Sequence, residues 1–312
     1  MVTFIIKRLL LLVPTVIGVV TIAFLVMRLI PGDAAQFILG DYATKEALAR
    51  LREQLGLTKP IYVQYFLFLS RALVGDFGRS LVTQRPAFDE ALAVFPYTLQ
   101  LAVAGTLLSM LIGVPIGIIS ALRRNTLVDF FAMTFALVGV SMPVFWKGLL
   151  LLLIFSFYLG WTPAIGAGEA GNMLSQLHHL ALPALTLGIA IAALVARLTR
   201  STMLEVVRQD YIRTARAKGL GEHWVIVKHA LRNASLPIVT VMGINFGVQL
   251  GGTILIETVF ARPGLGNILI SSIYQRDYPV VQATVVMFAS SFILVNLLVD
   301  LLYFMLDPRL KE

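Results

Sequence analysis

Residues 210–237 of this 312-residue chain read DYIRTARAKGLGEHWVIVKHALRNASLP, a polar and cation-rich segment set between two long apolar runs. The run before it is Leu180–Ala196, and the run after it is Asn233–Ile256. Because charged side chains are costly in lipid, a membrane protein keeps such a segment on one face of the bilayer. We therefore expect residues 210–237 to be offered to a soluble partner.

The composition is that of an integral membrane protein. Hydrophobic residues make up 58% of the chain and charged residues 13%, with a mean hydropathy of +0.86. Most charge-free runs are long enough for a spanning helix of about 20 residues, and the alternation typical of a membrane barrel is absent. We predict an all-α fold with six spanning helices, from Leu9–Met27, Ala91–Leu122, Phe130–Trp146 with Gly148–Gly168, Leu180–Ala196, Asn233–Ile256 and Pro279–Val299.

The third of these runs is ambiguous. Phe130–Gly160 is too long for one straight crossing, and both Pro143 and Lys147 lie inside it. Proline removes a helical hydrogen bond and kinks a helix. We expect a tilted helix kinked at Pro143, with a re-entrant break as the alternative, and we expect Lys147 to snorkel outward.

Lys and Arg in the short loops set the predicted orientation, because they are retained on the cytoplasmic side. Lys7 and Arg8 precede the first run, as in a secretory signal, but the run is longer than a usual signal core and Arg28 ends it, which favours an uncleaved signal anchor. The loop between the fourth and fifth runs is the most basic, whereas Trp161–His179 on the opposite face holds no Lys or Arg. Both termini and residues 210–237 are therefore predicted to be cytoplasmic.

The long first loop, Pro31–Pro96, is predicted to form a small external subdomain with helical patterns at Lys45–Leu55 and Tyr62–Leu73. The net charge of +8 reflects the topology and suits anionic lipid, so no nucleic-acid partner is expected. The predicted organisation is 1–30 for the N-terminal end and first helix, 31–94 for the external subdomain, 95–306 for a membrane domain and 307–312 for a cytoplasmic tail. The membrane domain is predicted to have helices at about 96–122, 130–158, 180–203, 234–257 and 280–305, with a cytoplasmic loop at 205–233.

Residues for catalysis or for a cofactor are missing from the sequence. Without Cys, no disulfide, thiolate metal site or redox pair is possible. The four His have no metal-ligand spacing, and no G-x-x-x-x-G-K-[ST], G-x-S-x-G or H-E-x-x-H motif occurs. We predict that this chain is not an enzyme, has no catalytic residue, and binds no cofactor or metal.

Within residues 210–237 the pattern predicts two short helices joined by a turn. Tyr211–Lys218 holds good helix formers, and Gly219 ends it as C-terminal glycines do. Such a pair can enter a groove on a partner and transmit movement to the spans. From these residues alone, an amphipathic helix resting on lipid is an equal alternative. The second helix is expected at Trp224–Arg232, with an apolar stripe of Trp224, Val227 and Leu231 beside Lys228 and Arg232.

Motifs along nearly the whole chain resemble the membrane subunits of ABC importers. Arg213-Thr214-Ala215 followed by Gly219 resembles the cytoplasmic EAA loop of ABC importer permeases, in the form of the dipeptide and oligopeptide family. Arg213-Thr214 stand where the general pattern has Glu-Ala. Further similar motifs are Ile30-Pro31-Gly32-Asp33, Gly75-Asp76-Phe77-Gly78-x-Ser80, Leu182-Pro183-Ala184-Leu185-Thr186-Leu187-Gly188, Pro263-Gly264-Leu265-Gly266, Arg276-Asp277-Tyr278-Pro279 and Asp307-Pro308-Arg309.

The resemblance is to the B-type membrane subunit, and it implies a type I ABC importer permease fold in a bacterial inner membrane. It implies inward movement of small di- or oligopeptides by alternating access, with glutathione, a nickel chelate or another small solute as alternatives. The implied partners are a homologous second permease in a heterodimer, two cytoplasmic ATPases that bind ATP and Mg²⁺, and an external solute-binding protein. The implied ATPase-coupling residues are Tyr211, Arg213, Thr214, Ala215, Arg216, Lys218, Gly219, Leu220, Trp224, His229, Arg232 and Asn233.

Polar residues inside the apolar runs indicate a translocation path, because each is costly against lipid. Asn245 and Gln249 share a helix face, either for an interhelical hydrogen bond or for lining the path. Gly243, Gly247 and Gly251 form a small-residue stripe that predicts close helix packing. The path candidates are Gln100, Ser141, Asn245, Gln249, Glu257 and Gln282.

An ion channel or ion-coupled carrier is the alternative from another functional class. It would need a selectivity filter or buried carboxylates near the bilayer midplane. The sequence shows neither pattern, so the importer permease is the preferred prediction.

Overall fold

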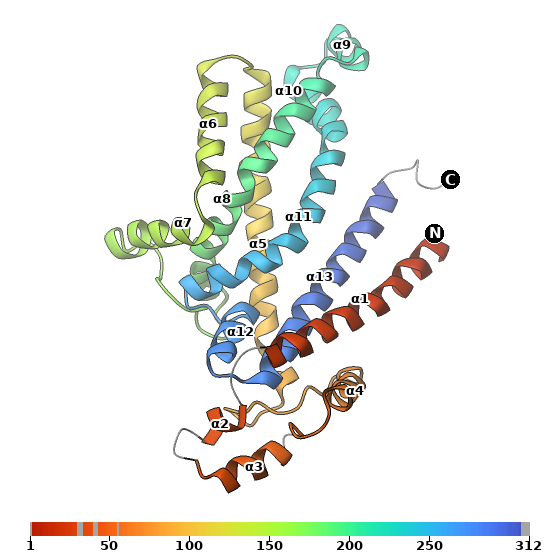
Figure 1. The fold of residues 1–312 in the computed structure, drawn as a ribbon. Helices are drawn as coiled ribbons and strands as arrows, with labels where there is room; N and C mark the ends of the chain where they lie inside the picture. The colour runs from red at the N-terminus through yellow and green to blue at the C-terminus, as the bar shows by residue number, and fades with distance from the viewer. Residues whose placement is uncertain (1, 30–33, 40–42, 55, 307–312) are drawn as a thin grey trace. The chain divides into compact units, whose positions relative to one another are not determined.

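The computed structural model describes residues 2–29, 34–39, 43–54 and 56–306, which are mainly helical (Figure 1). The motifs at 30–33 and 307–309 and the predicted tail at 307–312 lie outside the described residues. The all-α prediction is confirmed. The helices are α1 (Val2–Leu29), α2 (Ala34–Leu39), α3 (Lys45–Gln54), α4 (Ile61–Ala72), α5 (Ala87–Leu122), α6 (Leu127–Ser141), α7 (Val144–Leu151), the π-helix η1 (Leu152–Tyr158), α8 (Met173–Val206), α9 (Asp210–Ala217), α10 (Glu222–Trp224), the π-helix η2 (Val225–Leu231), α11 (Arg232–Val259), α12 (Leu265–Tyr274) and α13 (Tyr278–Leu306).

Helices long and apolar enough to cross a membrane occupy the second, fourth, fifth and sixth predicted spans. α1 is also helical over the first predicted span, and its apolar stretch Val13–Leu25 is shorter than a crossing. A total of six crossings therefore stays a prediction. The four long apolar helices within the described residues are Ala87–Leu122, Met173–Val206, Glu222–Val259 and Tyr278–Val299.

The third predicted span is broken, so the expectation of one kinked helix over residues 130–158 was wrong. The axes of α6 and of the helix that begins with α7 differ by 105°. Met142 is extended, with φ −83° and ψ 136°, because the ring of Pro143 disfavours helical geometry in the preceding residue. Lys147 does not snorkel outward either, since its side chain is buried. Its Nζ donates a 2.7 Å hydrogen bond to the Gly139 carbonyl oxygen across the break.

The chain divides into two compact units, of which the first comprises residues 1–98 and 263–294. Its α3 and α4 match the helical patterns predicted for the first loop. Val280 of α13 packs on the aromatic cluster of this unit, so residues 31–94 are not a separate compact body. The rings of that cluster follow one another at centroid distances of 5.8, 6.2 and 6.0 Å: Phe24, Phe68, Phe77 and Phe88.

The second unit comprises residues 99–262 and 295–312, and small residues let its α5 and α8 pack closely. A Cβ added to Gly113 or to Gly117 would lie 2.6 Å from a carbonyl oxygen of α8, a distance that only glycine avoids. Only part of the small-residue stripe predicted on α11 packs closely against another helix. A Cβ on Gly243 would lie 2.5 Å from Val299, whereas one on Gly251 would meet nothing within 4 Å.

Candidate coupling site

Residues 210–233, which we name the coupling hairpin, consist of α9, a turn and the start of the next helix (Figure 1). The inner side of α9 is apolar: Ile212 is fully buried and Ala215 is 7% exposed. Both side chains pack in one cluster with Met203 at the end of α8 and with Val225 of η2. Burial of this side fixes α9 against the end of α8, and its charged residues remain exposed.

Gly219 ends α9 in the left-handed conformation, with φ +77°, as the sequence predicts. Its amide donates to the Arg216 carbonyl oxygen at 2.9 Å, and the Leu220 amide donates to that of Ala215 at 3.4 Å. These two bonds form a Schellman cap, which satisfies carbonyl groups left over at a helix C-terminus. A Cβ at Gly219 would meet nothing within 4 Å, so glycine is required here by the backbone conformation alone.

Two side-chain contacts close the hairpin. At the turn, Arg216 donates from Nε to Glu222 Oε2 at 3.0 Å and from Nη2 to Oε1 at 2.6 Å. The hydrogen bond from Arg216 to the Glu222 carboxylate raises the pKa of Arg216, so the guanidinium stays charged at every physiological pH. At the open end, Asn233 Nδ2 donates to the Tyr211 hydroxyl oxygen at 2.9 Å. The arms are therefore tied at both ends of their apolar contact.

The second arm continues directly into α11, which begins at Arg232, near the predicted boundary at 234. No turn separates the two, because one helix runs through α10, η2 and α11 over residues 222–259. In the π-helical winding of η2, residues five apart share a face, and Val225 and Ala230 are both fully buried. Of the predicted apolar stripe, Trp224 and Val227 are 60% and 45% exposed, and Leu231 is half-buried.

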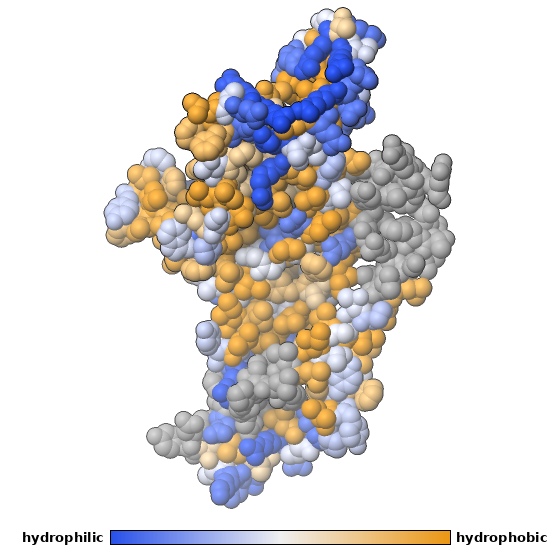
Figure 2. Space-filling view, turned by 45° about the horizontal axis from the view of Figure 1, so that its top comes forward, coloured by the Kyte–Doolittle hydropathy of each residue, from blue (hydrophilic) through white to orange (hydrophobic). Residues whose placement is uncertain are grey.

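The outer side of the coupling hairpin mixes large apolar side chains with cations. Tyr211, Leu220, Trp224 and Val227 are between 42% and 60% exposed. Lys228 Nζ lies 5.7 Å from the centroid of the Trp224 ring, which is cation–π distance. Figure 2 shows hydrophilic residues gathered over the end that carries α9 and α10. Exposed apolar anchors among charges suit docking into a groove on a soluble protein.

The predicted coupling residues divide by burial. Ala215 packs inward and His229 is half-buried. The Thr214 hydroxyl donates to the Asp210 carbonyl oxygen at 3.0 Å, which supports α9 itself. The exposed members, which a partner can reach, are Tyr211, Arg213, Thr214, Arg216, Lys218, Gly219, Leu220, Trp224, Arg232 and Asn233.

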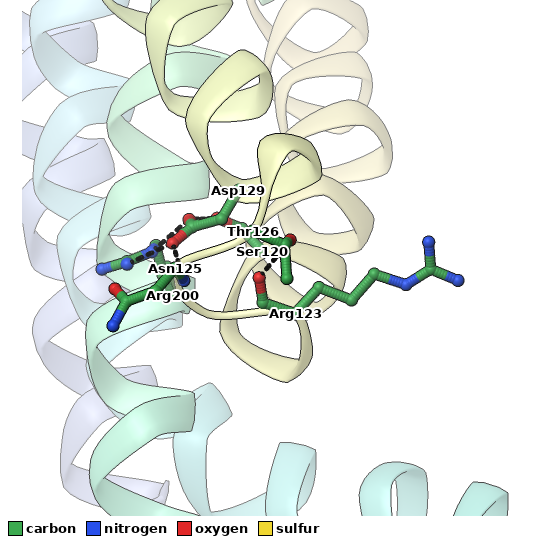
Figure 3. A network of polar contacts seen from close by, with 6 residues as sticks. All are labelled: Ser120, Arg123, Asn125, Thr126, Asp129 and Arg200. Atoms are coloured by element: carbon green, nitrogen blue, oxygen red, sulfur yellow. Dashed lines mark hydrogen bonds and ion pairs between the residues drawn. The ribbon is translucent and has the colours of Figure 1, made fainter.

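A buried ion pair that the sequence did not indicate ties α6 to α8 (Figure 3). Asp129 is 5% exposed. Arg200 donates from Nε and from Nη2 to the two oxygens of its carboxylate, both at 2.7 Å. The Ser120 hydroxyl and the Asn125 amide donate to the same carboxylate. The pair therefore joins the α5–α6 turn to the helix that leads into the coupling hairpin. Its members are 71 positions apart, so no local sequence pattern predicts that they meet.

Gln249 and Asn245 of the candidate path have different surroundings. Gln249 is 2% exposed, and its Oε1 accepts a 2.7 Å hydrogen bond from the Thr106 hydroxyl of α5. This is the interhelical bond that the sequence offered as one alternative. Asn245 is half-buried and donates to the Val241 carbonyl oxygen of its own helix at 2.8 Å. The structure thus gives Gln249 a packing role.

The other four path candidates differ from one another in exposure and in location. Gln100 is exposed and accepts a 3.3 Å hydrogen bond from Arg262 Nη2. Ser141 is exposed, beside the helix break, whereas Glu257 is fully buried. Gln282 belongs to the first unit and lines a cavity there. A role of these residues in a translocation path stays a prediction.

Two family models match the chain. Residues 113–312 match the binding-protein-dependent transport system inner membrane component, and residues 1–102 match the N-terminal part of that component. The glutathione transport system permease protein GsiC of Salmonella paratyphi A is 46% identical over 311 residues, which cover 100% of this chain and 99% of that protein. The protein of the same name from Escherichia coli K12 is 45% identical with the same coverage.

Solved ABC transporters share the fold. The MetNI methionine ABC transporter in an inward-facing conformation has a TM-score of 0.55 at 18% identity, over 67% of this chain and 93% of the matched chain. An amino acid ABC transporter solved with histidines has a TM-score of 0.51 at 16% identity, over 69% and 93%. The chain belongs to the binding-protein-dependent transport system inner membrane component family and is a multi-pass ABC importer permease.

Proposed function

We propose that this chain is the B-type permease subunit of an ATP-driven importer in a bacterial inner membrane. It forms a heterodimer with a homologous second permease. Two cytoplasmic ATPases bind ATP and Mg²⁺ and dock on the coupling hairpin, and an external binding protein delivers the solute. Both termini lie in the cytoplasm, and the path alternates between outward and inward access.

The proposed solute is a small peptide-like molecule, either a di- or oligopeptide or glutathione. Relatives named as glutathione transport permeases match the chain along its full length. This favours glutathione among the alternatives that the sequence left open.

One observation carries the docking role of the coupling hairpin: its own apolar face is already covered. Ile212 and Val225 are fully buried within the protein, so this face is not available to lie in lipid as an interfacial helix requires. The apolar side chains that remain exposed, above all Trp224, stand among cations. This arrangement favours docking of the coupling hairpin on a protein over binding of the hairpin to the membrane surface.

The first test removes the largest exposed anchor. Truncation of an aromatic hot spot costs about 2 kcal/mol or more, so we expect Trp224→Ser to weaken ATPase retention at least about tenfold during co-purification of the complex. The matched control is Trp161→Ser, whose ring is 64% exposed in the loop between η1 and α8. Full ATPase retention by Trp224→Ser, or an equal loss in the control, would contradict the docking role.

The second test separates coupling from solute choice in proteoliposomes that contain the whole transporter. Arg216 is unsuitable for charge reversal because it is paired with Glu222, so we choose Lys218→Glu/Lys228→Glu. This variant should import all solutes more slowly and rank glutathione, dipeptides and tripeptides as the unchanged transporter does. Asn245→Leu should alter the ranking, because Asn245 is the half-buried path candidate whose side chain bonds only within its own helix. A changed ranking in the lysine variant with ATPases bound would show that the roles are assigned to the wrong regions.

A further inference from the structure

The first unit contains a cavity of about 580 Å³, a size typical of small-molecule sites. Residues of α1, α3, the loop 56–59, α4, the loop 76–84 and the start of α13 line it. Every lining residue belongs to this unit. The cavity is distinct from the coupling hairpin, which belongs to the second unit.

The loop that forms one wall is held in place by buried contacts. The carboxylate of Asp277, 3% exposed, accepts hydrogen bonds from Ser80 Oγ at 2.5 Å and from the Leu81 amide at 3.1 Å. Phe77 is stacked on Phe88 and meets Phe68 edge to face, and Arg79 Nη1 donates to the Gln84 carbonyl oxygen at 2.9 Å. Because the wall is already ordered, a ligand loses less free energy to ordering it.

The cavity offers charged groups of both signs beside an aromatic surface. The Arg71 guanidinium, on the last turn of α4, makes no hydrogen bond or ion pair within the described residues. A free guanidinium binds a carboxylate through two parallel hydrogen bonds. Two carboxylates line the cavity as well: Asp76, which accepts a 2.9 Å hydrogen bond from the Gly78 amide, and Glu53, which is exposed. The lining groups that carry this chemistry are Lys59, Arg71 and Arg79, Glu53 and Asp76, and Phe24, Phe68 and Phe77.

We propose that this cavity is a binding site on the permease itself for a short peptide with a free carboxylate. The inference rests on the proposed function for its solute class and adds a site separate from the external binding protein. Arg71 and Lys59 bind the solute carboxylate, Glu53 attracts its ammonium group, and the half-buried Phe68 ring contacts its apolar portion. Glutathione and a tripeptide both have this pattern of charge.

The test measures direct binding of labelled glutathione and of trialanine to the permease heterodimer in nanodiscs, without the binding protein. Loss of a charge-assisted contact costs a factor of about ten or more, so Arg71→Gln should lower the affinity by at least that factor. Arg71→Lys should recover part of it. Trialanine with an amidated C-terminus should bind the unchanged permease as weakly as trialanine binds Arg71→Gln.

The matched control is Arg85→Gln, an exposed cation of the same loop region that does not line the cavity. It should leave the affinity unchanged. Three results would overturn the proposed site. The permease shows no saturable peptide binding, or Arg85→Gln loses as much affinity as Arg71→Gln, or Arg71→Gln affects only the docking of the binding protein. Import by a transporter whose permease binds no peptide overturns the site alone, whereas peptide binding without import overturns the proposed function alone.

Discussion

Two arginine–carboxylate pairs in the second unit have nearly the same geometry and different surroundings. Arg200 meets Asp129 through two contacts of 2.7 Å, and Arg216 meets Glu222 through contacts of 3.0 and 2.6 Å. The side chains of the first pair are 26% and 7% exposed, and those of the second 39% and 54%. Burial, and not contact geometry, should therefore decide what each pair contributes.

The physical reason is the loss of hydration. Removing one member of a buried pair leaves the other charge without water or partner, which costs about 3–5 kcal/mol. An exposed pair contributes about 0.2–1 kcal/mol, because water and salt compete for both groups. We expect the buried pair to fix the fold beneath the coupling hairpin and the exposed pair to adjust the hairpin alone.

The largest effect is expected from Arg200→Met. Asp129 is 5% exposed in the unchanged protein, and this variant leaves its carboxylate with only the Ser120 and Asn125 donors. The free energy of unfolding should fall by about 3–5 kcal/mol, measured by equilibrium unfolding in mixed micelles.

The double variant Asp129→Asn/Arg200→Met is the control, because it removes both charges. It should recover most of the lost stability, since no buried charge remains. If the double variant is as unstable as Arg200→Met, or if Arg200→Met costs no more than loss of the exposed pair, the comparison fails.

An intermediate effect is expected from Gly219→Val, which tests whether the turn holds the exposed pair together. A left-handed backbone costs a residue with a Cβ about 1–2 kcal/mol, and no steric clash adds to this cost because a Cβ would meet nothing within 4 Å. ATPase coupling should fall while membrane insertion is kept, measured as ATPase activity and uptake in proteoliposomes. Gly219→Asn should be milder, since Asn tolerates this conformation. Unchanged uptake by Gly219→Val would remove the turn from the coupling mechanism.

The smallest effect on folding is expected from Arg216→Met. Loss of this exposed pair should lower the free energy of unfolding by less than about 1 kcal/mol. The loss should shrink further at 1 M salt, where the Debye length is about 3 Å. An effect as large as that of Arg200→Met, or one insensitive to salt, would show that exposure does not separate the two pairs.

Local features of the coupling hairpin were predictable because they depend on neighbouring residues. The left-handed turn at Gly219 follows from glycine after a run of good helix formers. The burial of Val225 and Ala230 was not predictable, because a π-helical turn changes which residues share a face. A helical periodicity of 3.6 does not place these two residues, which are five positions apart, on the same face.

At the break before α7, too, a local feature was predictable and the arrangement of the helices was not. The pair Met142-Pro143 indicated a disturbed helix, and its restriction of the backbone is local. The angle of 105° is instead a property of how the two helices are arranged. Lys147 reaches across the break to Gly139, a contact that no apolar pattern specifies.

The sequence by itself determined the membrane class, the helical fold, the importer permease family and the position of the cationic segment 210–237, because each follows from composition, periodicity or contiguous motifs. Only the tertiary structure decided that Asp129 pairs with Arg200, that Gln249 bonds to Thr106, and that Asp277 holds the wall of a cavity. These contacts join residues 71, 143 and 197 positions apart. Their partners are chosen by helix packing and by the cost of leaving a buried polar group unsatisfied, which act between segments and not along the chain.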